Sequence, residues 1–166
     1  MQPKDIDRFF SCLAENYAGS ARVFVLGGAA ALLMGGVRPT LDIDFEVALS
    51  GGNRRYWDDF ETAVKAVEEE TGIEAQYSES VERWSMVTFL DYRTTATPHK
   101  AYGKIKVCLF SPMHWSLGKV SRFLQQDCDD MVAVFSKTKP DPEALIKIWK
   151  EALEKSPRSP NLSLVR

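Results

Sequence analysis

The sequence is poor in the residues that build disulfide frameworks and metal clusters. Its 166 residues include only three cysteines and two histidines. Cys12, Cys108 and Cys128 are odd in number and lack the spacing of metal ligands, so they predict reduced thiols of a cytoplasmic protein. His99 and His114 are isolated from each other along the chain. A disulfide-stabilised fold and a Cys/His metal site are therefore not expected.

Long apolar runs and an excess of one charge are also missing. No apolar run approaches the roughly 20 residues that a membrane span requires, and the first five residues do not have the pattern of a signal peptide. The 21 Lys and Arg residues nearly balance the 23 Asp and Glu residues. The overall charge therefore gives no reason to expect nucleic-acid or membrane binding, although a local basic patch is compatible with it. We expect a cytoplasmic protein without a membrane partner.

The length suits one domain with a substantial core. Hydrophobic periodicity predicts helices over residues 4–18 and 54–71, and a C-terminal helical part over residues 112–155. Apolar or alternating runs predict strands over residues 23–26, 41–47, 73–77, 86–91 and 102–110. Strands enclosed by helices indicate an α+β fold, in which helices pack over a central mixed α/β sheet.

Two polar stretches are predicted to lie outside regular structure. Residues 93–100 are polar and contain Pro98, which is typical of a mobile loop. Residues 156–166 are rich in Ser and Pro and have no periodicity, so they predict a flexible tail. The domain is therefore expected to span residues 1–155.

A glycine turn between a strand and a helix carries the first functional pattern. Gly27 and Gly28 follow the apolar strand of residues 23–26 and precede a helix-favouring run over residues 29–34. Glycine lacks a Cβ, so its backbone N–H group can come close to a phosphate, and the positive end of the following helix favours such an anion. The turn predicts a phosphate-binding site.

The strand of residues 41–47 carries the second half of this pattern. Alternation places Asp42, Asp44 and Glu46 on one face, and Ile43, Phe45 and Val47 in the core. Three acids on one face repel one another unless a cation lies among them. Mg²⁺ and Mn²⁺ prefer such oxygen ligands, and Mg²⁺ usually completes its shell with water and substrate phosphate. Asp42 and Asp44 are therefore predicted metal ligands.

The ordered combination of glycines and acids resembles a known signature. Gly27 and Gly28, a spacer, and then Asp42 and Asp44 are similar to the signature of the nucleotidyltransferase superfamily, which has the DNA polymerase beta-like fold. Residues 38–44 resemble the Arg-x-Thr-x-Asp-x-Asp motif of AbiEii-type toxins and related bacterial nucleotidyltransferase-like proteins. The resemblance implies Mg²⁺-dependent transfer of a nucleoside monophosphate from an NTP to an acceptor hydroxyl of a tRNA, a protein or a small molecule. It also implies that Arg38 and Thr40 contact the substrate, and that an antitoxin is a partner.

A second constellation lies in the C-terminal part. Lys119 and Arg122 are three residues apart, which predicts one shared helix face. Asp127 is predicted to cap the next helix, with Asp130 in its first turn, and capping alone would account for both acids. The segment also resembles the Lys-x-x-Arg…Asp-x-x-Asp motif of the same toxin-like families. By that resemblance Lys119, as a catalytic residue, and Arg122 neutralise the triphosphate, while Asp127 and Asp130 orient them.

The chain departs from the superfamily pattern at one position. Members commonly carry a third acid on a later strand, and the aligned position here is Lys106. Asp91 and Glu46 are the alternative third acids. A different function, a non-catalytic NTP- or RNA-binding protein on the same fold, predicts instead that Lys106 pairs with Asp42 or Asp44 in place of the cation.

Overall fold

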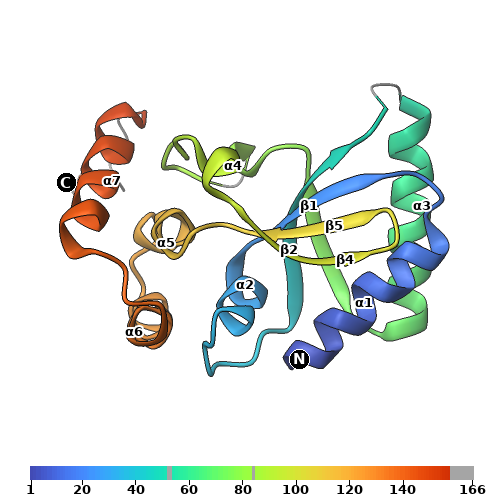
Figure 1. Cartoon of the computed structure of the whole chain (residues 1–166), viewed down its shortest axis with the longest axis horizontal. Helices are drawn as coiled ribbons and strands as arrows, with labels where there is room; N and C mark the ends of the chain where they lie inside the picture. Colours follow the sequence, from blue (N-terminus) through green and yellow to red (C-terminus); the bar gives the residue numbers. More distant parts are fainter. Residues whose placement is uncertain (52–53, 84, 158–166) are drawn as a thin grey trace.

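The computed structural model describes residues 1–51, 54–83 and 85–157, and has an α+β architecture around one mixed sheet (Figure 1). The strands are β1 (Ala21–Val25), β2 (Asp42–Leu49), β3 (Glu74–Ser78), β4 (Thr97–Tyr102) and β5 (Ile105–Leu109). The helices are α1 (Pro3–Asn16), α2 (Gly27–Leu33), α3 (Arg54–Thr71), α4 (Tyr92–Thr95), α5 (Pro112–Val120), α6 (Gln125–Thr138) and α7 (Pro142–Lys155). The structure confirms the predicted α+β architecture of a mixed sheet with helices packed over it.

The sheet has the strand order β3-β2-β1-β5-β4. Strands β1 and β2 are antiparallel, whereas β1 is parallel to β5 and β2 is parallel to β3. The antiparallel hairpin of β4 and β5 turns at Gly103, whose φ of 54° favours a residue without a Cβ. This order places the acidic strand β2 beside the strand that leads into the glycine turn.

Helices α1 and α3 cover one face of the sheet. Phe10 from α1 and Phe60 from α3 both contact Phe45 of β2, with ring centroids 5.8 and 6.3 Å apart. Phe45 also stacks on Tyr77 of β3 at 5.4 Å. Burial of each such side chain stabilises the fold by about 1.5–3 kcal/mol. The predicted burial of Ile43, Phe45 and Val47 is confirmed, since each is at most 1% exposed.

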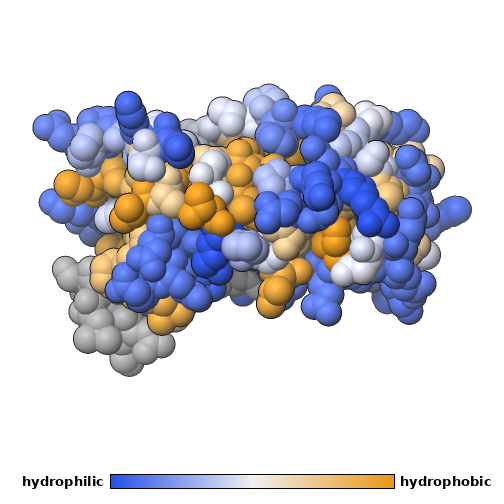
Figure 2. All heavy atoms as spheres, turned by 90° about the horizontal axis from the view of Figure 1, so that it is seen from below, coloured by the Kyte–Doolittle hydropathy of each residue, from blue (hydrophilic) through white to orange (hydrophobic). Residues whose placement is uncertain are grey.

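The C-terminal helices α5, α6 and α7 form a group at one end of the sheet (Figure 1). Trp149 of α7 donates a hydrogen bond to Ser116 of α5 at 2.8 Å, which attaches the last helix to this group. Hydrophobic residues gather mainly over this half of the face seen in Figure 2. The exposed large hydrophobic residues of α6 and α7 include Val132 and Ile146. No helix within the described residues is long and apolar enough to cross a membrane.

Residues 86–100 differ from the sequence prediction. Residues 86–91 are irregular and form no strand, whereas the predicted loop of residues 93–100 contains most of α4 and most of β4. Strand β4 lies at the sheet edge and its pairing with β5 is irregular between Pro98 and Lys100; edge strands and bulges are where a sheet tolerates proline. Pairing with β5 therefore overrides the polar, Pro-containing composition of this stretch.

The chain termini and helix ends add smaller findings. The helix predicted over residues 54–71 is confirmed as α3, although the cap predicted at Asn53 lies outside the described residues. Of the predicted tail of residues 156–166, Ser156 is buried and accepts a hydrogen bond from the Thr88 N–H group at 2.8 Å. The remainder of that tail, residues 158–166, also lies outside the described residues.

Candidate functional site

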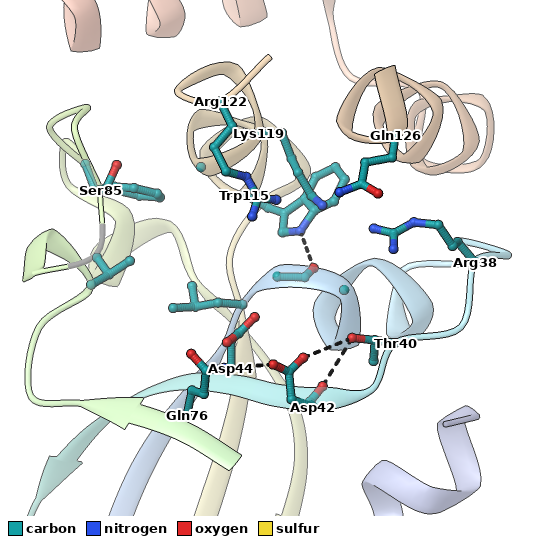
Figure 3. A pocket seen from close by; sticks show the side chains of 16 residues that line it. Arg38, Thr40, Asp42, Asp44, Gln76, Ser85, Trp115, Lys119, Arg122 and Gln126 are labelled. Carbon is teal, nitrogen blue, oxygen red and sulfur yellow. Dashed lines mark hydrogen bonds between the residues drawn. The ribbon is translucent and has the colours of Figure 1, made fainter. Parts of the chain in front are cut away.

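A cavity of about 470 Å³ lies where β2 begins, between α2, α5 and the connection that leads from β3 to α4 (Figure 3). Most of the residues predicted from the sequence line it, namely Gly27, Gly28, Arg38, Thr40, Asp42, Asp44, Lys119 and Arg122. The other two, Asp127 and Asp130, accept hydrogen bonds from Lys119. Residues more than 75 positions apart in the sequence therefore meet at one site.

The acidic side of the cavity is formed by the first residues of β2. Asp42 accepts hydrogen bonds from Thr40 Oγ1 at 3.3 Å and from Gln76 Nε2 at 2.9 Å. Burial, followed by the nearby charge of Asp42, raises the pKa of Asp44 to about 6. No ion pair of the described residues includes either carboxylate. The acid pair therefore carries uncompensated negative charge.

The glycine turn packs directly against these acids. Gly27 has a φ of +55°, and a Cβ at this residue would lie 2.1 Å from Asp44 Oδ2. A Cβ at Gly28 would lie 2.7 Å from Thr40 Oγ1. Both glycines belong to the first turn of α2, which begins two residues earlier than predicted. They are thus needed for close packing against Asp44 and Thr40, in addition to the phosphate approach that the sequence suggested.

The opposite side of the cavity is a network of alternating charges. Lys119 Nζ donates to Asp127 at 3.1 Å and to Asp130 at 2.7 Å, although the lysine side chain is only 3% exposed. Arg122 donates to Asp127 at 2.7 Å. Arg38 makes two bonds to Asp130, at 2.8 and 2.5 Å. Three cations thus share two acids, which leaves this wall with one net positive charge.

Burial would raise the pKa of Asp130, but its bonds to Arg38 and Lys119 outweigh this effect and hold the pKa below its ordinary value. Asp127 is fully buried, and its Oδ2 atom has no hydrogen-bond partner among the described residues. An acceptor oxygen left unpaired in a buried ionic network is costly. The cationic wall is therefore held by strong but incompletely satisfied interactions.

The capping role predicted for Asp127 is wrong. Helix α6 begins at Gln125, its N-cap is Leu124, and Asp127 already lies within the first turn. The preceding helix α5 ends at Val120, so Arg122 belongs to the turn between the helices rather than to the same helical face as Lys119. The two cations converge because both bind Asp127, which local helix spacing does not reveal.

Lys106 lies away from the acid pair, so it neither takes the place of a third acid nor pairs with Asp42 or Asp44. It is exposed on β5, beside Arg22 of β1, which in turn lies opposite Ala48 of β2. Ala48 lies four residues beyond Asp44, so Lys106 is remote from the acid pair. Sequence spacing alone does not fix strand register, so it does not reveal how far Lys106 lies from the acids of β2.

Neither alternative acid joins Asp42 and Asp44. Glu46 is fully buried and accepts hydrogen bonds from Tyr92 and Arg93. Asp91 lines a second cavity, of about 350 Å³. Within the described residues, no group of three or more His, Cys, Asp or Glu side chains is arranged to hold a metal ion. Two carboxylates nevertheless fit Mg²⁺, which commonly takes one or two protein carboxylates together with water and substrate phosphates.

The sequence interpretation missed several further cavity residues, among them Gln76, Trp115 and Gln126. Gln76 lies opposite Asp44 in the β2–β3 pairing and bonds to Asp42. Trp115 Nε1 donates to the Gly27 carbonyl at 2.9 Å, and Gln126 lies beside Arg38 in Figure 3. Strand alternation predicts which face of β3 carries Gln76. Only the pairing of β3 with β2 shows that this side chain lies next to Asp42 and Asp44. The sequence carries no signal that directs Trp115 or Gln126 to the site.

Comparisons of the chain with protein-family models, with curated proteins and with solved structures find no significant match.

Proposed function

We propose that this protein is a metal-dependent nucleotidyltransferase with a nucleotidyltransferase-like fold. The observation that supports the proposal most is the opposition of charges across one cavity. Asp42 and Asp44 form no ion pair, and the facing wall carries a net positive charge from Lys119, Arg122 and Arg38. A divalent cation with a bound triphosphate has the charge distribution that complements these two walls.

In this proposal Asp42 and Asp44 hold Mg²⁺ or Mn²⁺, which polarises phosphoryl oxygens when bound. The backbone of Gly27 and Gly28 cradles the triphosphate, and Thr40 positions Asp42 through its hydrogen bond. The acceptor hydroxyl oxygen attacks the α-phosphorus of the NTP and loses its proton to solvent, while the bond to the leaving pyrophosphate breaks. Lys119 and Arg122 stabilise the charge that develops on pyrophosphate.

The alternative of a binding protein in which Lys106 replaces the cation is less well supported, because Lys106 lies beside Arg22 and remote from Asp44. The acceptor, whether a tRNA, a protein or a small molecule, and an antitoxin partner follow from the resemblance alone. A cytoplasmic location also belongs to the proposal.

The direct test is transfer of label from four α-³²P-labelled NTPs, with Mg²⁺ or Mn²⁺, to total RNA, to the protein itself and to small hydroxyl compounds. Wild type and Lys106→Ala should both transfer label, whereas Asp44→Asn should not. Lys106 is a suitable control because it is an exposed residue outside the cavity.

A binding measurement supports the same test without requiring the acceptor. A non-hydrolysable NTP with Mn²⁺ at about 100 times its Kd should stabilise wild type by about 2.7 kcal/mol. Absence of stabilisation with all four bases, together with absence of label transfer, would exclude the proposed activity.

A further inference from the structure

Glu46 shares a strand face with Asp42 and Asp44 but has a different environment. Its side chain is fully buried and accepts three hydrogen bonds from protein donors. These come from Val81 N at 2.7 Å, Tyr92 Oη at 2.5 Å and Arg93 Nε at 2.8 Å. A buried carboxylate needs such partners, since an isolated charge in the interior is strongly unfavourable. The mechanism proposed above does not use this group.

The three donors lie at the two ends of one segment. Val81 begins the segment, while Tyr92 and Arg93 end it, so a single carboxylate holds both ends against β2. Arg93 also donates to the Glu79 carbonyl at 3.2 Å, which adds a second contact between the two ends of the connection. The connection between β3 and β4 is therefore folded back on itself at Glu46.

The start and the middle of the segment form one wall of the cavity. Val81, Ser85 and Phe89 line it, and Figure 3 places Ser85 on the side away from Arg38 and Gln126. The ring centroid of Phe89 lies 5.8 Å from that of Phe110, which directly follows β5, and the Thr88 N–H group donates to Ser156. The wall is thus mainly apolar and is attached to the sheet and to the end of α7.

We propose that Glu46 is a positioning residue that sets the nucleobase-binding wall of the cavity. The inference rests on the proposed function. When the triphosphate lies between the acid pair and the cations, the nucleoside of the same NTP lies against the wall formed by Val81, Ser85 and Phe89. Glu46 then determines where Val81 and Phe89 meet the base, because it holds both ends of their segment. Glu46 itself contacts neither the metal nor the substrate.

The test separates binding of the base from binding of the phosphates. Titrations with Mn²⁺ and each of four non-hydrolysable NTPs are compared with titrations of Mn²⁺ and inorganic tripolyphosphate, which has no base. Tyr92→Phe and Arg93→Lys each remove or weaken one donor to Glu46 and keep most of the side chain. Arg83→Lys is the matched control, because Arg83 is exposed and its ion pair is to Glu79 rather than to Glu46.

We expect Tyr92→Phe and Arg93→Lys to weaken NTP binding about tenfold, which is the size of a lost base–aromatic contact, and to leave tripolyphosphate binding unchanged. Arg83→Lys should change neither. Equal weakening of both ligands, or no change in either, would overturn the role of Glu46 while the proposed function stands. Wild type that binds neither NTP nor tripolyphosphate would overturn both proposals.

Glu46→Gln provides a second measurement. Glutamine keeps the shape and one acceptor oxygen but loses the charge that pairs with Arg93. If the variant folds, its NTP affinity should fall while tripolyphosphate affinity is kept, as for the donor variants. If it does not fold, Tyr92→Phe and Arg93→Lys decide the question.

Discussion

The two charged walls of the cavity differ in how their ionisable groups are paired. On β2, Asp42 and Asp44 lie close enough for Asp42 to raise the pKa of Asp44, yet neither forms an ion pair. On the facing wall, Lys119, Arg38 and Arg122 are each bound to Asp127 or Asp130. The first wall retains the capacity to bind a cation, whereas the second is already organised.

This difference indicates how the two walls contribute to binding. A network that is paired before the ligand arrives needs little reorganisation, so its cations are held in position for an anion. The acid pair, in contrast, is strained by mutual repulsion until a cation is present. The two walls also interact electrostatically, since the charges of Arg122 and Lys119 both act to lower the pKa of Asp44. Four substitutions test this contrast.

The largest effect should come from Lys119→Met, which breaks the paired wall. The substitution leaves Asp127 and Asp130 buried with less positive charge, so the free energy of unfolding should fall by about 3–5 kcal/mol. Urea denaturation measures it, with Lys106→Met as the exposed control. Equal stability of the two variants would contradict the view of Lys119 as the centre of the network.

Gly27→Ala should disturb the acidic wall. A left-handed backbone costs a non-glycine residue about 1–2 kcal/mol, and the new Cβ would also displace Asp44 Oδ2, which lies 2.1 Å away. Gly72→Ala is the matched control, because Gly72 has a φ of +69° but nothing within 4 Å of the added Cβ. Both variants should lose stability by thermal denaturation, and only Gly27→Ala should also lose Mn²⁺ affinity. Unchanged Mn²⁺ binding in Gly27→Ala would show that this contact does not position Asp44.

Asp44→Asn should change the pH dependence of stability. The folded pKa of Asp44 is raised from 3.8 to about 6, so the native state favours the protonated form. Its contribution to stability is complete below the unfolded pKa and is lost as the pH rises through about 6. Without divalent cations, wild type should therefore lose stability between about pH 4 and pH 6 relative to Asp44→Asn.

Denaturation at a series of pH values measures this difference, and saturating Mn²⁺ should reduce it, because a bound cation favours the ionised carboxylate. Parallel pH profiles for wild type and Asp44→Asn would contradict the assigned environment of Asp44.

The smallest effect is expected for Arg38→Lys, at the exposed edge of the paired wall. Lysine keeps the charge but cannot make the two bonds that Arg38 makes to Asp130. The Arg38 side chain is 42% exposed, so water partly replaces the lost contact, and the free energy of unfolding should fall by less than about 1 kcal/mol. A loss as large as that of Lys119→Met would show that the buried and exposed cations contribute equally.

Local patterns predicted much of the fold and part of the site. Alternation along β2 correctly assigned Ile43 and Phe45 to the core, because period 2 is a property of any extended strand. It also placed Asp42, Asp44 and Glu46 on one face, but it did not separate the open pair from the buried acid. That separation depends on Tyr92 and Arg93. Both donate to Glu46, although they lie 46 and 47 positions further along the chain.

What the sequence determined by itself is the local part of this protein: the glycine turn, the alternating acids, the long helix α3 and the core face of β2. These follow from backbone geometry and side-chain periodicity, which act over a few residues. Only the tertiary structure decided that β4 is an edge strand, that Lys106 lies beside Arg22, and that Asp127 binds Lys119 rather than capping a helix. The physical reason is that strand register and the burial of charge depend on partners brought together from distant segments.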